Sequence, residues 1–211
     1  MNMKSTKIGI FDYSAGNLGS LKSAFYRIGF DNVLVTSDLP TLEETDCIIL
    51  PGVGSFGHCI ETLNKNQDAS SFFKKFLENE DKLLVGICIG MHLLGNTSEE
   101  SDGYPGLGLI PFNVRKIKVN GDQRLPHVGW NTIDSFSNDL NTLDGILDVY
   151  FDHSYQLVCD PKLVISKTFY GEEIPAIIKK GNIVGIQFHP ELSGRTGSDL
   201  LKHIVQGELN C

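Results

Sequence analysis

Cys88 lies at the centre of the segment Gly86-Ile87-Cys88-Ile89-Gly90, which has the spacing G-x-C-x-G. A continuous apolar run precedes this segment and a helical pattern follows it, so the chain must turn sharply at the cysteine. Such a turn holds its nucleophile in a strained conformation, and glycines on both sides avoid backbone collisions. The N-terminus of the helix favours a thiolate through its N–H groups and dipole. The spacing therefore predicts a nucleophilic cysteine, with the N–H of Ile89 as one oxyanion donor.

Cys88 has two other interpretations. It is a buried thiol packed between two glycines in the first, because unpaired cysteines are commonly buried. In the second it shares a metal ion with His92, four residues later on the same helical face. No second pair of residues has ligand spacing, and the strand–turn–helix context favours the nucleophile. The other cysteines lack that context and are expected to be core or surface thiols: Cys47, Cys59, Cys159 and Cys211.

A cysteine nucleophile needs a general base, and His189-Pro190-Glu191 supplies one at the end of an expected strand. Proline biases the preceding residue toward an extended conformation, in which residues two apart share a face. Glu191 can then orient the imidazole of His189, which predicts a Cys-His-Glu triad for acyl transfer. The pair Asp152-His153 is a weaker candidate, because adjacent strand residues point to opposite faces.

The elements that position these residues alternate through the first half of the chain. The expected strands are residues 7–11, 33–36, 47–50 and 83–87, and the expected helices contain residues 18–28 and 72–77. This order predicts an α/β fold with an open, mostly parallel sheet and helices on both faces. The run 83–87 is apolar without alternation, which is typical of a central strand buried on both faces.

The second half is richer in strands, and we expect it to add antiparallel strands to the sheet. The expected strands are residues 113–119, 150–158, 163–168, 174–178 and 183–188. An amphipathic helix with Leu200, Leu201 and Ile204 ends the chain, and Thr196 with Asp199 resembles a capping box at its start. No linker divides the sequence, so one domain, residues 1–211, is predicted.

Composition argues against several classes of partner. The formal net charge of −8 disfavours nucleic acid and anionic membranes. No apolar stretch approaches the roughly 20 residues needed to span a bilayer. The five cysteines are widely spaced and form no paired framework, so a reducing, cytoplasmic location is expected.

These motifs resemble those of class I glutamine amidotransferases, and among them the glutaminase subunits of imidazole glycerol phosphate synthase. The segment Gly86–Gly90 together with Met91, and the His189-Pro190-Glu191 triplet, resemble the class signature. Essentially the whole chain shares the resemblance, and the further segments that carry it are residues 12–18, 51–56, 126–131 and 150–155.

The resemblance implies a flavodoxin-like sheet, hydrolysis of L-glutamine through a thioester on Cys88, and neither cofactor nor metal. The glycine-rich segment Gly52-Val53-Gly54 is implied to supply the second oxyanion donor after its backbone reorients. The implied glutamine contacts are Gly52, His92, Ser154 and Tyr155. The residues implied at the ammonia mouth and partner interface are Asn17, Trp130, Asn131, Tyr150 and Leu192. The implied partner is a (β/α)₈ cyclase subunit, which forms a heterodimer and uses the ammonia in histidine biosynthesis.

Three residues depart from the usual pattern of this family. His92 stands in place of glutamine, Asp152 in place of valine and Leu192 in place of lysine. The changes lie near the expected interface, so an alternative is a paralogous subunit that supplies ammonia for amidotransfer to a surface-polysaccharide or flagellin sugar. Two other classes of function stay open: a catalytically silent binding partner, and a cysteine hydrolase that acts on another amide.

Overall fold

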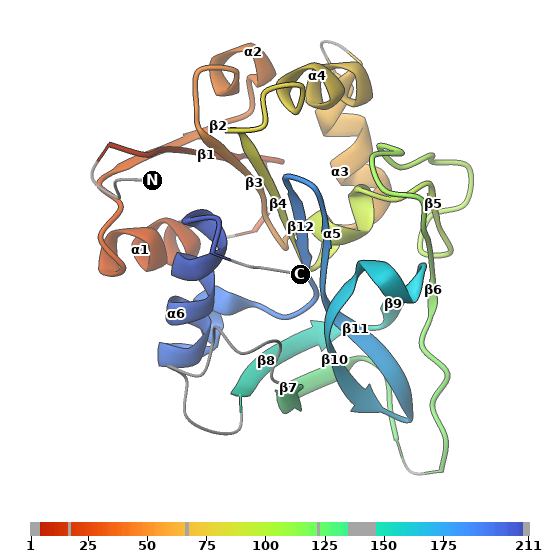
Figure 1. Ribbon diagram of the computed structural model, residues 1–211. Helices are drawn as coiled ribbons and strands as arrows, with labels where there is room; N and C mark the ends of the chain where they lie inside the picture. The colour runs from red at the N-terminus through yellow and green to blue at the C-terminus, as the bar shows by residue number, and fades with distance from the viewer. Residues whose placement is uncertain (1–4, 17, 66–67, 122, 135–146, 209–211) are drawn as a thin grey trace.

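The computed structural model describes residues 5–16, 18–65, 68–121, 123–134 and 147–208. Helices and strands alternate in the first half of the chain, and strands dominate the second (Figure 1). In chain order the elements are β1 (Lys7–Phe11), α1 (Gly19–Arg27), β2 (Asn32–Thr36), α2 (Leu39–Leu42), β3 (Cys47–Leu50), α3 (Phe56–Leu63), α4 (Ala69–Phe76), β4 (Leu83–Ile87), α5 (Ile89–Leu93), β5 (Thr97–Ser98), β6 (Asn113–Lys116), β7 (His127–Ile133), β8 (Leu147–His153), β9 (Tyr155–Val158), β10 (Val164–Tyr170), β11 (Glu172–Lys180), β12 (Ile183–Ile186) and α6 (Gly194–Val205), with 3₁₀ turns at Pro161–Leu163 and Pro190–Leu192.

A seven-stranded sheet forms the centre of the molecule, in the order β10-β11-β12-β4-β3-β1-β2. Strands β2, β1, β3, β4 and β12 run parallel, and β11 and β10 add antiparallel pairs at one edge. Parallel neighbours require crossover connections, which α1 supplies between β1 and β2 and α3 and α4 supply between β3 and β4. The predicted mostly parallel sheet with antiparallel strands from the C-terminal half is confirmed, and β1, β3 and β4 have the predicted bounds.

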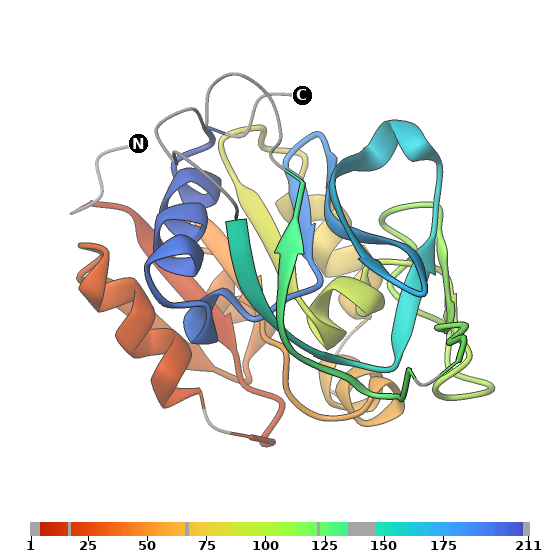
Figure 2. The ribbon, with the colours of Figure 1, turned by 90° about the horizontal axis from the view of Figure 1, so that it is seen from below.

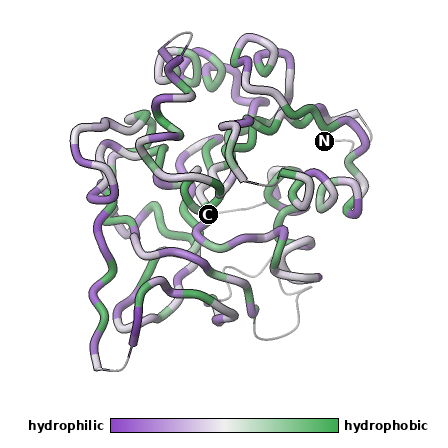
Figure 3. Tube along the Cα trace, turned by 180° about the vertical axis from the view of Figure 1, so that it is seen from behind, coloured by the Kyte–Doolittle hydropathy of each residue, from purple (hydrophilic) through white to green (hydrophobic). Residues whose placement is uncertain are grey.

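Helices cover both faces of this sheet (Figures 1 and 2). Successive strand residues point to opposite faces, so neighbouring residues of β3 enter different cores. Ile49 belongs to the cluster that includes α1 and α6, and Ile48 belongs to the cluster that includes α3, α4 and α5. Apolar residues follow the central strands along the chain trace (Figure 3). Burial on both faces explains why the strands read as continuous apolar runs.

The strand-rich half departs from the prediction in several places, and the expected strands 113–119 and 183–188 already end at Lys116 and Ile186. Residues 150–158 do not form one strand, because the chain bends at Ser154 and β8 and β9 belong to different small sheets. Strand β7 was not predicted, although it pairs with β8 along its whole length. Its side chains are mostly exposed or half-buried, and the apolar Val128 and Trp130 are among the exposed ones, so no core-facing apolar pattern marks the segment as a strand. Pairing with β8, whose partner residues lie 14 to 26 positions later, makes this segment a strand.

The beginning of α6 also differs from the prediction. Ser193 precedes the first helical residue, Gly194, and no side chain caps this end of the helix. Thr196 therefore lies inside the first turn, and the capping box expected from Thr196 and Asp199 is wrong. The expected start lies three residues too late, because a pattern of residue types alone marks a helix boundary less sharply than the backbone geometry does.

Candidate active site

Three neighbouring parallel strands end at the same edge of the central sheet. β3 pairs with β4 up to Leu50 and Gly86, and β4 pairs with β12 up to Ile87 and Ile186. Ligands of open α/β sheets bind beyond such carboxyl ends. The glycine-rich segment 51–54, the cysteine and the histidine follow these strands, so the fold brings together residues that lie far apart in the sequence.

Cys88 forms the turn between β4 and α5. Its φ of 48° and ψ of −109° are rare for a non-glycine residue, and its N–H donates to the Ile186 carbonyl at 2.7 Å. A Cβ on Gly86 would lie 2.5 Å from the Gly90 carbonyl oxygen, and a Cβ on Gly90 would lie 2.0 Å from the Leu50 carbonyl oxygen. The sharp turn predicted from G-x-C-x-G is present, and both glycines are required by backbone that approaches closely.

His189 is held by its neighbours on both sides. Its backbone is extended, as the following proline predicts, and the 3₁₀ turn Pro190–Leu192 comes next. The His189 Nδ1–H donates to Glu191 Oε1 at 2.9 Å. The His189 N–H donates to the Tyr150 carbonyl at 2.9 Å, and the Ser193 hydroxyl donates to the His189 carbonyl at 2.6 Å. The carboxylate orients the imidazole as predicted, although a turn rather than a continuing strand brings it there.

The electrostatics of His189 favour its protonated form. Burial lowers its pKa, but hydrogen bonds and charge from Cys88 and Glu191 outweigh the burial and raise the pKa to about 11. A histidine with a pKa this high keeps its proton at neutral pH. The imidazole beside Cys88 is therefore able to deliver a proton to a leaving group, which is the acid step of cysteine-dependent acyl transfer.

A cleft of about 320 Å³ opens beside Cys88. Its lining contains every predicted glutamine contact and the predicted oxyanion residues other than Val53. The lining residues are Gly52, Gly54, Cys88, Ile89, His92, Glu100, Pro126, Asp152, His153, Ser154, Tyr155 and His189. A Cβ on Gly52 would lie 2.7 Å from His189 Cε1 and 2.9 Å from Cys88 Cβ, so the space between nucleophile and base admits no side chain.

Glu100 lines the cleft and was missed by the sequence analysis. Burial raises the pKa of its carboxyl group, and the backbone N–H of Phe56 acts in the opposite direction. The neighbouring Glu99 instead accepts the Lys116 N–H at the surface. No motif distinguishes these two adjacent carboxylates. Only the fold turns one of them toward the cleft, where it suits a cationic group on a ligand.

His92 presents a neutral ring to the cleft. Its Nε2–H donates to Gln187 Oε1 at 2.9 Å, and its Nδ1 has no partner among the described residues. Burial lowers its pKa to about 4, and the bond to Gln187 opposes that effect only in part. The interpretation of Cys88 and His92 as metal ligands gains no support: within the described ranges, no group of three or more His, Cys, Asp or Glu side chains could hold a metal ion.

The residues expected at the ammonia mouth lie on β7, β8 and the turn after His189. Trp130 is 59% exposed and stands edge-on to Tyr150, with ring centroids 6.1 Å apart. Leu192 is 48% exposed, whereas the Asn131 amide is bonded within the protein. Asn17 lies outside the described residues. Because the Tyr150 carbonyl holds His189, this surface connects directly to the candidate base.

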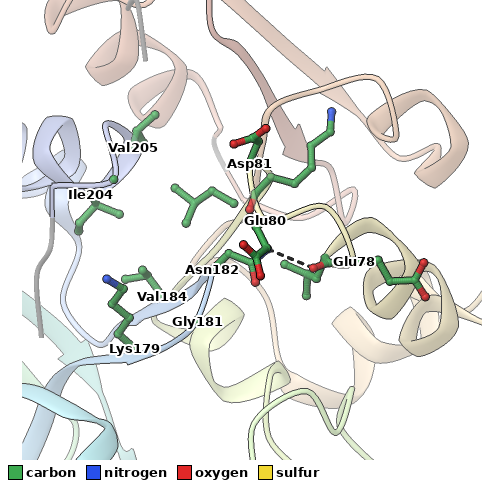
Figure 4. Close-up of a pocket in the computed structure, with 13 residues that line it drawn as sticks. Glu78, Glu80, Asp81, Lys179, Gly181, Asn182, Val184, Ile204 and Val205 are labelled. Atoms are coloured by element: carbon green, nitrogen blue, oxygen red, sulfur yellow. Dashed lines mark hydrogen bonds between the residues drawn. The ribbon is translucent and has the colours of Figure 1, made fainter.

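A second depression lies at the amino ends of β4 and β12, opposite the cleft (Figure 4). Charged residues of both signs, such as Asp81 and Lys179, line it together with apolar residues such as Val184 and Ile204. The described residues of its lining include no cysteine, serine or histidine, so we assign the chemistry to the cleft beside Cys88. In the part of the chain that the structure describes, no helix is long and apolar enough to cross a membrane.

The fold and the cleft define a class of protein, and the sequence comparison agrees with them. Residues 10–206 match the family described as glutamine amidotransferase class-I. The chain belongs to the class I glutamine amidotransferase family.

Within this family, the chain is similar to imidazole glycerol phosphate synthase subunits named HisH. It is 40% identical to that subunit of Bacillus cereus over 199 residues, which cover 93% of this chain and 92% of the relative. It is also 40% identical to the subunit of Methanocaldococcus jannaschii over 202 residues, which cover 94% and 98%. The resemblance inferred from the motifs is confirmed.

Solved structures share the fold at lower identity. A glutamine amidotransferase crystal structure matches with a TM-score of 0.73 and 18% identity, covering 95% of this chain and 98% of that chain. The structure of PurLQS from Thermotoga maritima matches with a TM-score of 0.70 and 19% identity, covering 97% and 99%.

Proposed function

We propose that this chain is the single-domain glutaminase subunit of an imidazole glycerol phosphate synthase. The observation that carries the proposal is the interacting series Cys88, His189 and Glu191 at the edge of a cleft. An identity of 40% to HisH subunits over nearly their whole length supports the assignment to this synthase.

Cys88 is the nucleophile in the proposed reaction. Its sulfur attacks the carbonyl carbon of the glutamine side-chain amide and forms a tetrahedral oxyanion. The N–H of Ile89 and a peptide N–H of residues 52–54 stabilise that oxyanion, and one such donor contributes about 2.7–4 kcal/mol. His189 protonates the departing nitrogen, which leaves as ammonia, and a thioester stays on Cys88. Water then attacks the thioester while His189 accepts its proton, and glutamate leaves.

The cleft supplies groups suited to the rest of glutamine. Glu100 is a carboxylate that can pair with the α-ammonium group, and Ser154 and Tyr155, which also line the cleft, offer hydrogen-bonding groups. The Nδ1 of His92 is an acceptor that the protein leaves without a partner among the described residues. Buried acceptors gain most from a ligand that supplies a donor.

The partner in this proposal is a (β/α)₈ cyclase subunit that docks over the mouth of the cleft. Val128 and Trp130 on β7 and Leu192 after His189 are exposed apolar side chains. Aromatic side chains are enriched in the cores of protein interfaces. A cytoplasmic location belongs to the same proposal, because the four described cysteines are unpaired thiols, as is usual in reducing compartments.

The decisive experiment compares glutamine and ammonium salts as nitrogen sources for the reconstituted synthase. Cys88→Ala should abolish the glutamine-dependent reaction and leave the ammonium-dependent one, because only glutamine hydrolysis needs the thiol. Cys159→Ala, the same change at a half-buried cysteine outside the cleft, serves as the matched control and should retain both reactions. Glutamine-driven synthesis in Cys88→Ala would rule out this nucleophile.

A separate measurement addresses the partner. Glutaminase turnover should be weak for the isolated chain and rise when the cyclase subunit is added, since the oxyanion segment is expected to reorient on docking. Equal turnover with and without the cyclase would contradict that dependence.

A further inference from the structure

Two buried histidines outside the proposed triad form a continuous chain of hydrogen bonds at the wall of the cleft, which His153 helps to line. His127 on β7 and His153 on β8 are cross-strand partners, and their rings meet at 3.0 Å between His127 Nδ1 and His153 Nε2. His153 Nδ1 lies 2.8 Å from the Tyr155 carbonyl oxygen. His127 Nε2 lies 3.2 Å from Asn131 Nδ2. The chain thus runs from Asn131 to Tyr155.

Each proton in this chain is fixed by its neighbours. A carbonyl only accepts, so His153 must carry its proton on Nδ1 and a lone pair on Nε2. His127 must then donate from Nδ1, which leaves its Nε2 to accept from the amide of Asn131. The second Asn131 amide hydrogen donates to the Phe169 carbonyl at 3.1 Å. All donors point the same way, and both imidazoles are neutral.

The surroundings of the two rings favour this neutral state. His127 is 3% exposed and His153 is 5% exposed. Burial lowers the pKa of His127 to about 4 and that of His153 to about 3. The rings of His92 and His189 also face His153 and disfavour a further positive charge. An added proton would leave one donor in the chain facing another donor.

The chain of hydrogen bonds ends at the Tyr155 carbonyl, at the corner where the backbone passes from β8 to β9. The Ser154 carbonyl accepts the Ile117 N–H at 3.0 Å, while the Tyr155 carbonyl accepts from His153. These two bonds set the orientation of consecutive peptides at the corner. Ser154 and Tyr155 line the cleft, and the Asp152 carbonyl lies 3.6 Å from Cys88 Sγ. The corner therefore forms one wall of the space beside the nucleophile.

The chain of hydrogen bonds begins at Asn131, on the exposed β7–β8 hairpin. Asn131 follows Trp130 on β7, and the His127 ring is stacked between Tyr170 and Phe151, with centroid distances of 4.1 and 4.7 Å. This packing holds His127 rigidly against β8 and β10. A shift of β7 would therefore be passed through the two rings to the cleft wall.

We propose that His127 and His153 are positioning residues that hold the Ser154–Tyr155 wall of the cleft in register with the exposed β7–β8 hairpin. The proposal rests on the proposed glutaminase function, because its main readout is the binding of glutamine. Among the described residues, the hydrogen bonds of the two rings go to each other, to Asn131 and to the Tyr155 carbonyl, and not to the three residues of the proposed triad. The rings act through the Tyr155 carbonyl, so their loss weakens substrate binding more than it slows the chemical step.

The test compares two replacements of His153. His153→Leu removes the donor to the Tyr155 carbonyl and should raise KM for glutamine about tenfold, the loss of one hydrogen bond's contribution, with kcat within about twofold of wild type. Asparagine places an amide N–H where the Nδ1–H lies, so His153→Asn should return KM to within about threefold of wild type. His203→Leu, on α6, is the control and should change neither constant.

The outcomes separate this proposal from the proposed function. An unchanged KM in His153→Leu, or equal defects in His153→Leu and His153→Asn, would overturn the positioning role. If His153→Leu does not fold, His127→Phe cuts the chain one link earlier, keeps a ring between Tyr170 and Phe151, and should also raise KM.

Nitrogen-15 NMR of wild-type protein at pH 7 should show protons on Nδ1 and none on Nε2 of both rings. The other tautomer, or a protonated ring, would also refute the chain. A wild-type protein that shows these tautomers but hydrolyses no glutamine would refute the proposed function and leave the hydrogen-bonded chain standing.

Discussion

Gly52→Ala tests how closely the nucleophile and the base approach each other. The added Cβ would lie 2.7 Å from His189 Cε1, 2.9 Å from Cys88 Cβ and 3.1 Å from the Ile87 carbonyl oxygen. Non-bonded carbon atoms pack at about 3.5–4.0 Å. One or both side chains must therefore move by roughly 0.6–1.3 Å to restore that separation. The Ile87 carbonyl oxygen prevents the new Cβ from moving away from the other two groups, so Cys88 and His189 must shift instead.

The size of this displacement sets the expected effect. A misplacement of about 1 Å costs on the order of 10²-fold in rate, and overpacking of a tight site costs about 1–3 kcal/mol of stability. We expect kcat for glutamine hydrolysis to fall about 100-fold. Ammonium-dependent synthesis by the complex should stay at the wild-type rate, because it does not use Cys88.

Gly57→Ala is the matched control for this experiment. Its Cβ would lie 3.3 Å from Ser101 Oγ and Tyr104 Cδ2, and alanine is favoured over glycine within a helix such as α3. Glutamine hydrolysis should be measured for both variants at saturating substrate, with circular dichroism to establish folding. A folded Gly52→Ala protein with wild-type kcat would refute the close approach of Cys88 and His189 on which the proposed mechanism depends.

Three further predictions concern stability and partner binding. Burial lowers the pKa of His92 to about 4, so its contribution to stability is intact above about pH 6.5 and is lost as pH falls toward 4. Between pH 6.5 and pH 4, the free energy of unfolding measured in urea should fall by about 3 kcal/mol more for wild type than for His92→Gln. Equal decreases in the two proteins would contradict this. The hydrogen bond from Arg115 lowers the pKa of Glu172 to about 2, so Glu172 stabilises the fold above about pH 4.5 and loses this effect as pH falls through 2. Glu172→Gln should cost about 2 kcal/mol at pH 7 and about 1 kcal/mol at pH 3, whereas a deficit independent of pH would exclude the ion pair as its cause. Trp130→Ala should weaken binding of the cyclase subunit at least about 30-fold by calorimetry, without changing partner-free glutaminase turnover, if Trp130 is an interface hot spot.

The sequence alone specified the elements whose information is local. β1, β3 and β4 have the bounds predicted from their apolar runs, because a strand buried on both faces excludes polar residues over its whole length. The turn at Cys88 was predictable for a similar reason. A side chain at Gly86 or Gly90 would collide with the backbone of Gly90 or Leu50. The turn therefore requires glycine two residues before and two residues after the cysteine, and both positions can be read from the sequence. The His189-Pro190-Glu191 triplet likewise contains both the ring and the carboxylate that orients it.

Only the tertiary structure decided the features that depend on distant segments. β7 became a strand by pairing with β8, and the bend at Ser154 arose because β8 and β9 join different sheets. Glu100, rather than Glu99, lines the cleft, and His127 on β7 is hydrogen-bonded to His153 on β8. These outcomes depend on contacts between residues far apart in the chain, whose free energies local residue types do not encode. The sequence therefore determined the reacting groups and the central strands, and the packing of distant segments determined the wall of the cleft around them.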